Sequence, residues 1–165
     1  MSKIISLTLV LILMAFSLQA HAEIGKEVDN FDNTTSIYSE IAGQGPWETV
    51  KFGITREKDG RKKYFLTLTK IDPEWWFFDN HPAGVKIGKK IYGAPCVETD
   101  SKTLAGNKLF TSGRFLVERK TIRRIKKAET LTIRVYSSNN PSITWEVPDH
   151  ALAEWKVVIS RAKEI

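Results

Sequence analysis

The sequence predicts a mainly β fold with helices (α+β): an antiparallel β-sandwich or partly open barrel, with a short basic helix and a C-terminal amphipathic helix packed on the sheet. Three observations support this class. Short segments in which apolar and polar residues alternate recur along the chain. Turn sequences, Asp59-Gly60 and residues 138–141, separate two pairs of these segments. The last segment has the 3.6-residue apolar period of a helix instead. We expect one domain over residues 34–165.

The N-terminus predicts export. Residues 4–18 form an almost wholly apolar run of 15 residues, which follows Lys3 and precedes the small-x-small sequence Ala20-His21-Ala22. A membrane-spanning helix needs roughly 20 residues. We therefore expect a signal peptide over residues 1–22 that is cleaved, rather than an uncleaved anchor. The remaining chain is expected to be soluble, without a transmembrane anchor, and periplasmic or secreted across a bacterial-type envelope. Residues 23–33 are polar and are expected to lead loosely into the first strand.

The first half of the domain predicts several strands. Residues 34–42 are expected to form the first one. Residues 49–56 and 63–71 alternate clearly, and the Asp-Gly turn between them favours a tight β-hairpin, because such turns need positive φ angles. Residues 84–92 are a further strand candidate. Residues 92–108 have no periodicity and are interpreted either as a long loop or as one that contains a short strand around Cys96.

The end of the chain predicts a second hairpin and a helix. Residues 130–136 and 142–147 alternate on either side of the turn at residues 138–141. After Pro148, five apolar residues fall within an arc of about 120° on a helix, and we expect this stripe to cover a sheet or a barrel opening. These residues are Leu152, Trp155, Val158, Ile159 and Ala162.

Four consecutive aromatic residues are a candidate ligand or partner surface. Successive side chains of an extended segment point to opposite sides, so Trp75 and Phe77 share one side while Trp76 and Phe78 share the other. A core on one side accommodates only one pair. The other pair packs beneath the C-terminal helix, packs against another sheet, or forms an exposed binding patch. His81 follows in a polar turn and belongs to this candidate surface.

Residues 118–128 form a strongly basic run. On a helix, Ile122 and Ile125 lie about 60° apart and the cations lie opposite them, which favours a short helix that buries two isoleucines and solvates its charges. The alternative is a patch for an anionic partner. Nucleic acid is disfavoured because no aromatic residue is interleaved for base stacking. The candidates for this patch are Arg119, Lys120, Arg123, Arg124 and Lys127.

Charge and cysteine content limit the possible partners only weakly. The whole chain carries a net charge of +6, and Lys3 is the only charge before Glu23, so residues 23–165 carry +5. A basic surface favours anionic partners. Cys96 is the only cysteine, which excludes an internal disulfide. We interpret it as a small buried side chain, with an intermolecular disulfide as the alternative.

The sequence contains no recognisable catalytic or metal-binding motif. Neither CxxC, HExxH nor GxSxG occurs, so we assign no catalytic residue, no metal ligand and no cofactor. The expected function is that of a small exported binding or accessory protein that contacts another protein or an envelope component. The alternative is a small cell-envelope hydrolase or carbohydrate-processing enzyme, using Trp platforms with Asp72, Glu74, Asp79 or His81. The sequence leaves the oligomeric state open.

Overall fold

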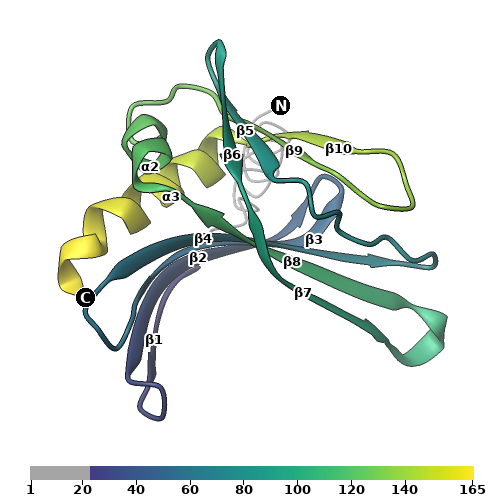
Figure 1. Cartoon of the computed structure of the whole chain (residues 1–165), viewed down its shortest axis with the longest axis horizontal. Coiled ribbons are helices and arrows are strands. Elements are labelled where there is room, and N and C mark those ends of the chain that lie inside the picture. The colour runs from purple at the N-terminus through teal and green to yellow at the C-terminus, as the bar shows by residue number, and fades with distance from the viewer. Residues whose placement is uncertain (1–22) are drawn as a thin grey trace, which may run out of the picture.

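The alternating segments fold into two antiparallel sheets, which pack against each other and against two helices (Figure 1). The structure is a computed structural model that describes residues 23–165. The expected signal peptide lies outside the described residues. One sheet has six strands in the order β1-β2-β3-β4-β8-β7, and the other has four in the order β10-β9-β5-β6. The predicted fold class is therefore confirmed, including the short helix and the C-terminal helix on the sheet.

The elements follow one another along the chain with short connections. The six-stranded sheet consists of β1 (Glu23–Asp29), β2 (Thr34–Gln44), β3 (Trp47–Arg56), β4 (Lys62–Asp72), β7 (Cys96–Thr103) and β8 (Leu109–Val117). The four-stranded sheet consists of β5 (Ala83–Ile87), β6 (Lys90–Ala94), β9 (Thr132–Val135) and β10 (Ile143–Glu146). The helices are α2 (Arg119–Ile125) and α3 (Asp149–Ser160), with 3₁₀ turns η1 (Ala105–Asn107) and η2 (Arg161–Glu164). None of the helices in the described residues is long and apolar enough to cross a membrane.

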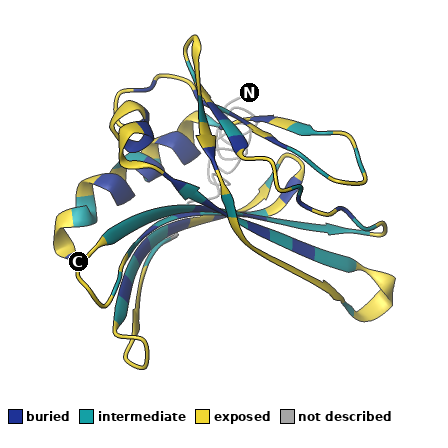
Figure 2. Ribbon diagram, in the orientation of Figure 1, coloured by how far each residue is buried: buried dark blue, intermediate teal, exposed yellow. Residues whose placement is uncertain are grey.

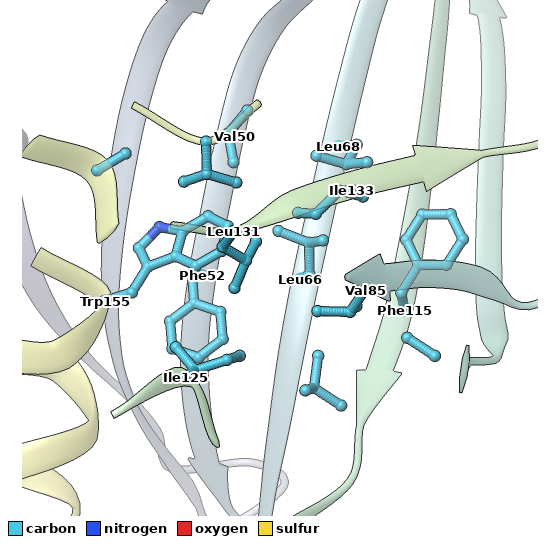
Figure 3. Close-up of a cluster of buried hydrophobic side chains, with 14 of the residues drawn as sticks. Val50, Phe52, Leu66, Leu68, Val85, Phe115, Ile125, Leu131, Ile133 and Trp155 are labelled. Atoms are coloured by element: carbon cyan, nitrogen blue, oxygen red, sulfur yellow. The ribbon is translucent and has the colours of Figure 1, made fainter. Parts of the chain in front are cut away.

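One face of the six-stranded sheet is buried by the helices and by the second sheet (Figure 2). The period of two in each strand produces this face, because every second side chain points into the core. Figure 3 shows the result: Val50, Phe52, Leu66, Leu68 and Phe115 meet Val85, Leu131 and Ile133 from the other layer, and Ile125 and Trp155 from the helices. No element of residues 23–165 covers the opposite face of the six-stranded sheet.

Helix α3 is fixed over strands β2 and β3. The Trp155 ring stacks on Phe52, with 4.8 Å between ring centroids and 18° between their planes. Such aromatic pairs contribute about 0.5–1.5 kcal/mol beyond their burial. The fully buried Ser39 hydroxyl donates a hydrogen bond of 2.8 Å to the Glu154 carboxylate of α3, so this buried polar group has a partner. The predicted apolar stripe is correct: Leu152, Trp155, Val158 and Ile159 are buried, and Ala162 is partly buried against the core.

Both predicted hairpins are confirmed. Strands β3 and β4 pair in antiparallel register, with Phe52 opposite Leu66, and Gly60 in their turn has φ of +80°. A side chain at that φ is strained, which explains the glycine. Strands β9 and β10 pair with Trp145 opposite Ile133.

The structure differs from the sequence interpretation in three segments. Residues 23–33, expected to lead loosely into the first strand, form β1 and its turn, and β1 pairs with β2 along its whole length. Residues 84–92, expected as one strand, are a hairpin of β5 and β6, because Gly88 has φ of +57° and reverses the chain inside an otherwise unbroken alternation. Residues 92–108 contain the eight-residue strand β7, nearly all of it exposed at the sheet edge, so burial imposes no periodicity on it.

Candidate binding surface on the outer face of the six-stranded sheet

The uncovered face of the six-stranded sheet is hollow. The sheet curves away from the helices, so this face is its concave side (Figure 1). A half-open hollow of about 660 Å³ extends across it from Glu27 on β1 to Asp100 on β7. Its floor consists of the side chains between the buried ones on each strand, such as Tyr38, Thr67 and Ser112. We call this hollow the outer groove.

Two aromatic rings in the floor of the outer groove are each covered by a cation. The Lys51 ammonium lies 3.6 Å from the centroid of the Tyr38 ring, and the Arg114 guanidinium lies 3.8 Å from that of Phe65. Each such contact is worth about 0.5–1 kcal/mol at an exposed site. Lys51 also approaches Glu40 at 3.7 Å, and Arg114 approaches Glu98 at 3.4 Å. The central cations are therefore held in place and paired.

Glycines on the two neighbouring strands leave room for Tyr38 in the groove floor. A Cβ atom at Gly25 on β1 would lie 2.5 Å from Cζ of the Tyr38 ring. One at Gly53 on β3 would lie 3.1 Å from Cβ of the same residue. Both distances are shorter than ordinary van der Waals contacts. The two glycines are thus required for the present shape of the groove floor.

Carboxylates line the two edges of the outer groove. Glu27, Asp29 and Asp32 lie on the β1–β2 hairpin, and Asp100 lies on β7 at the opposite edge. None of these four forms an ion pair within residues 23–165. Asp29 accepts hydrogen bonds from two backbone amides of its own turn, at 2.8 and 3.2 Å.

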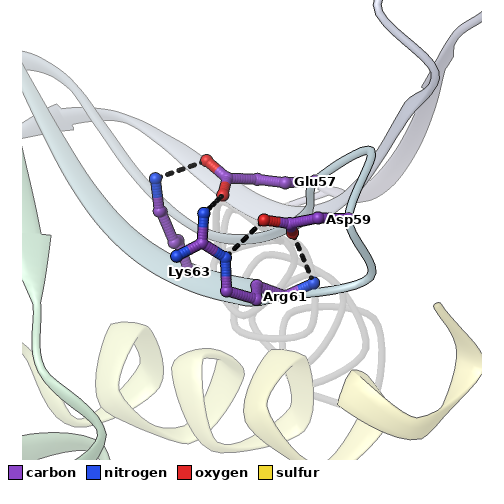
Figure 4. Close-up of polar contacts among 4 residues, drawn as sticks. All are labelled: Glu57, Asp59, Arg61 and Lys63. Carbon is purple, nitrogen blue, oxygen red and sulfur yellow. Dashed lines mark hydrogen bonds and ion pairs between the residues drawn. The ribbon is translucent and has the colours of Figure 1, made fainter.

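A fifth carboxylate at the edge, Glu57, is neutralised locally. Its oxygens lie 2.5 Å from the Lys63 ammonium and 3.9 Å from the Arg61 guanidinium (Figure 4). The Arg61 side chain also pairs with Asp59. The backbone amide of Arg61 donates a hydrogen bond to the Asp59 carboxylate, and this bond lowers the pKa of that carboxyl. Glu57 therefore adds little to the potential in the groove.

Negative charge is concentrated in the outer groove of a basic protein. Six carboxylates and two cations line it, a formal net charge of −4, of which the carboxylate of Glu57 is neutralised by Lys63 and Arg61 outside the groove. Residues 23–165 carry +5 together, so the rest of the described chain carries +9. Concave surfaces lined by one sign of charge concentrate ions of the opposite sign.

The four consecutive aromatics divide as their alternation predicts. Trp76 and Phe78 are buried, and their rings contact Trp47, while Phe78 also contacts Phe115. The helix residue Trp155 pairs with the rings of Phe52 and Trp145 and with none of these four aromatics, so the expected packing of the second pair beneath the C-terminal helix is not found.

The other aromatic pair lies at the surface. Phe77 is 39 % exposed and stacks on half-buried Trp75, with ring centroids 5.3 Å apart. The Asn139 side chain fixes this segment: it accepts a bond of 3.0 Å from the Phe77 amide and donates one of 2.8 Å to the Trp75 carbonyl. The side chain of Asn140 donates to the same carbonyl at 2.9 Å. Because the two rings stack on each other, one face of each is covered, and the exposed patch that Trp75 and Phe77 form is small.

The structure brings the side chains of two of the four candidate catalytic residues into contact, because His81 Nδ1 lies 3.0 Å from the Asp79 carboxylate. Asp72 and Asp79 each bind a neighbour two residues away, and these side-chain hydrogen bonds, from Lys70 and His81, lower the pKa of both carboxyls. A general acid needs a raised pKa instead. Glu74 and His81 are exposed. Within residues 23–165, no group of three or more His, Cys, Asp and Glu side chains is placed to hold a metal ion.

The basic run forms α2, and its isoleucines point inward. Ile122 and Ile125 are buried, while the cations of the patch, Arg119, Lys120, Arg123, Arg124 and Lys127, are all exposed.

Cys96 is half-buried rather than fully buried. It is a free thiol whose pKa is raised mainly by burial.

Comparison with known proteins adds no further assignment. No protein-family model, curated protein or solved structure matches this chain. The candidate site is therefore argued from its own geometry.

The outer groove is not apparent from the sequence. Its residues come from strands far apart in the chain, and they meet only because β4 pairs with β8 and β8 pairs with β7. One signal was present: Phe65 stands on the otherwise polar side of its strand. The acidic pair Glu98 and Asp100 also alternates along β7, in a segment interpreted as a loop.

Proposed function

We propose that this protein is an exported binding protein, and that its outer groove binds a basic, extended segment of a partner protein. The proposal is carried by one observation: four carboxylates without a cationic partner in the described chain line the two edges of a groove on a protein that is otherwise basic. They are Glu27, Asp29, Asp32 and Asp100. A basic ligand supplies the missing partners.

The separation of the carboxylates favours an extended ligand over a small amine. β1 and β7 are the two edge strands of a six-stranded sheet. Neighbouring strands lie about 4.8 Å apart, so β1 and β7 are roughly 24 Å apart across the sheet, and the pairing register also offsets Asp100 from Asp29 along the strands. An extended peptide needs at least about seven or eight residues to cover this length, at roughly 3.3 Å per residue. A single ammonium group reaches only one edge.

The floor between the edges suits a polypeptide backbone. Thr67 and Ser112 supply hydroxyl groups that donate and accept hydrogen bonds, while the hydroxyls of Ser36 and Thr55 bond each other at 2.9 Å and keep their remaining lone pairs for a ligand. The central cations lie on Tyr38 and Phe65 and are paired, so they are not available to repel the ligand strongly. Phe31 stands at the tip of the β1–β2 turn beside the acidic edge and is 97 % exposed. Exposed aromatic anchors of this kind often contribute strongly to protein–protein binding.

A fluorescently labelled octalysine peptide tests this function, with octaglutamate as the opposite-charge control. We expect octalysine to raise the fluorescence anisotropy on binding and octaglutamate not to do so. Binding should weaken at physiological salt, where charges are screened beyond about 8 Å. The triple variant Asp29→Asn, Asp32→Asn, Asp100→Asn removes three charges, and asparagine retains the oxygen that caps the turn at position 29.

The size of the effect follows from the ion pairs lost. An exposed ion pair contributes about 0.2–1 kcal/mol, so losing three weakens binding roughly 3-fold to over 100-fold. The matched control neutralises three exposed carboxylates outside the groove: Glu48→Gln, Glu129→Gln, Glu146→Gln. Equal weakening in both triple variants would show that net charge, rather than the groove, binds the peptide. Absence of octalysine binding at low salt would refute the proposal outright.

A further inference from the structure

A second charged surface lies on the other side of the molecule. Six cations occur between residues 119 and 127, and all of them are exposed. Four belong to α2, and the next two follow at its C-terminal end. We call these residues the α2 basic face: Arg119, Lys120, Arg123, Arg124, Lys126 and Lys127.

The α2 basic face has almost no internal compensation. Lys120 pairs with Glu118 at 2.7 Å. The other five cations form no ion pair within the part of the chain that the structure describes. A solvated face of an ordinary helix usually mixes both signs of charge. Here the helix residues from Arg119 to Ile125 include no acidic side chain at all.

The fold holds this face in one orientation. Thr121, Ile122 and Ile125 are buried beneath the helix, so α2 cannot rotate its cations inward. The Lys156 ammonium of α3 donates a hydrogen bond of 2.6 Å to the Ala128 carbonyl and ties down the end of the segment. In Figure 1, α2 and α3 lie on the same side of the six-stranded sheet. The outer groove is lined by side chains on the opposite face of that sheet.

We propose that the α2 basic face docks onto an anionic lipid surface. The charges are complementary, and the net charge of +5 on residues 23–165 attracts the whole molecule to the same surface. The exposed side of α2 is convex, and it can lie on a flat surface of lipid headgroups without needing a matching pocket. A lipid-bound molecule then directs its outer groove away from the surface, where it is open to a basic partner.

Other polyanionic or self-associating partners fit less well. Nucleic acid is disfavoured because no aromatic side chain lies among the cations to stack on bases. A second copy, with this face in the acidic outer groove, would bring two whole molecules together, each with a charge of +5 on residues 23–165, and is an outcome of the test below. The lipid proposal is independent of the proposed peptide binding, because the two surfaces share no residue.

Vesicle co-sedimentation of the purified protein tests the docking. We expect binding to vesicles that contain phosphatidylglycerol and none to vesicles of phosphatidylcholine alone. Each Lys or Arg near an anionic surface changes the partition coefficient about fivefold. The variant Arg119→Gln, Arg123→Gln, Arg124→Gln should therefore lower it roughly 100-fold. The matched control, Lys58→Gln, Lys102→Gln, Lys108→Gln, removes the same charge from exposed positions on the β3–β4 and β7–β8 hairpins, away from α2 (Figure 1), and should lower it much less.

Three results would overturn the proposal. One is the absence of binding to phosphatidylglycerol vesicles at low salt, with circular dichroism showing a folded protein. Another is an equal loss of binding in both triple variants, which would indicate an effect of net charge alone. The third is that Arg119, Arg123 and Arg124 are required for a different interaction: either self-association measured by sedimentation equilibrium, or binding of single-stranded DNA that is tighter than binding of vesicles.

Discussion

Two adjacent phenylalanines, Phe77 and Phe78, should differ strongly in their contribution to stability. Phe78 is 9 % exposed, and its ring stacks on Trp47 and meets Trp76 and Phe115 edge-on, with centroids 4.9–6.3 Å away. Phe77 is 39 % exposed and contacts only the Trp75 ring among the aromatic pairs of the described residues. The two side chains are chemically identical, so replacing each by alanine isolates the effect of burial.

The expected losses can be estimated from these contacts. Phe78→Ala removes a buried ring and leaves a cavity, which costs about 3–5 kcal/mol. Phe77→Ala removes one surface aromatic pair and part of a buried ring, about 1 kcal/mol. A domain of this kind has a free energy of unfolding of about 5–15 kcal/mol, so the first loss is a large fraction of the total.

Urea unfolding followed by circular dichroism measures both changes. With a denaturant slope of about 1–3 kcal/mol per molar, Phe78→Ala should lower the midpoint by roughly 1 M or more, and Phe77→Ala by much less. Equal losses, or a greater loss for Phe77→Ala, would refute the assignment of Phe78 to the core and of Phe77 to the surface.

Three further predictions follow from individual contacts. Gly25→Ala should displace the Tyr38 ring, because the added Cβ would lie 2.5 Å from Cζ of that ring, and octalysine binding should weaken. The control Gly93→Ala should leave octalysine binding unchanged, because its added Cβ would lie 3.5 Å from its nearest neighbour. Iodoacetamide should alkylate Cys96 more slowly than a free cysteine near pH 8, because burial raises the pKa of its thiol. Mass spectrometry measures the rate of alkylation, and a rate equal to that of free cysteine would contradict this prediction. Lys70→Met should lower the free energy of unfolding by no more than about 1 kcal/mol at pH values above 3.8, the ordinary pKa of Asp72. The difference from the wild type should vanish as the pH falls through the lowered pKa of the Asp72 carboxyl. If urea titrations in the acid range show the same difference at low pH, the ion pair is not its source.

Local patterns were sufficient where burial and turn chemistry act together. The alternation of Phe52 and Leu66 and the Asp-Gly turn between their strands predicted the first hairpin, and the spacing of Leu152 and Trp155 predicted the face that α3 buries. The division of the four aromatics into two pairs also followed from alternation alone. Each of these features depends on neighbours within one or two elements.

The outer groove could not be derived in the same way. Its two acidic edges, at Asp29 and Asp100, meet across a sheet whose strand order depends on pairings distant in sequence, such as Leu66 with Phe115. Strand β7 is exposed, so its sequence has no hydrophobic period. The turn at Gly88 interrupts no pattern, because apolar and polar residues alternate on both sides of it. Sheet curvature, which makes the polar face concave, has no signature in any single strand.

The binding of a basic peptide in the outer groove can be mapped residue by residue. Octalysine should be titrated into ¹⁵N-labelled protein and followed by amide chemical shifts at low salt. The account predicts saturable shifts at groove positions such as Tyr38, Thr67 and Ser112, and at both acidic edges, with α2 unaffected. Shifts confined to one edge, to the Trp75 and Phe77 patch, or spread evenly over the exposed carboxylates of the molecule would contradict it.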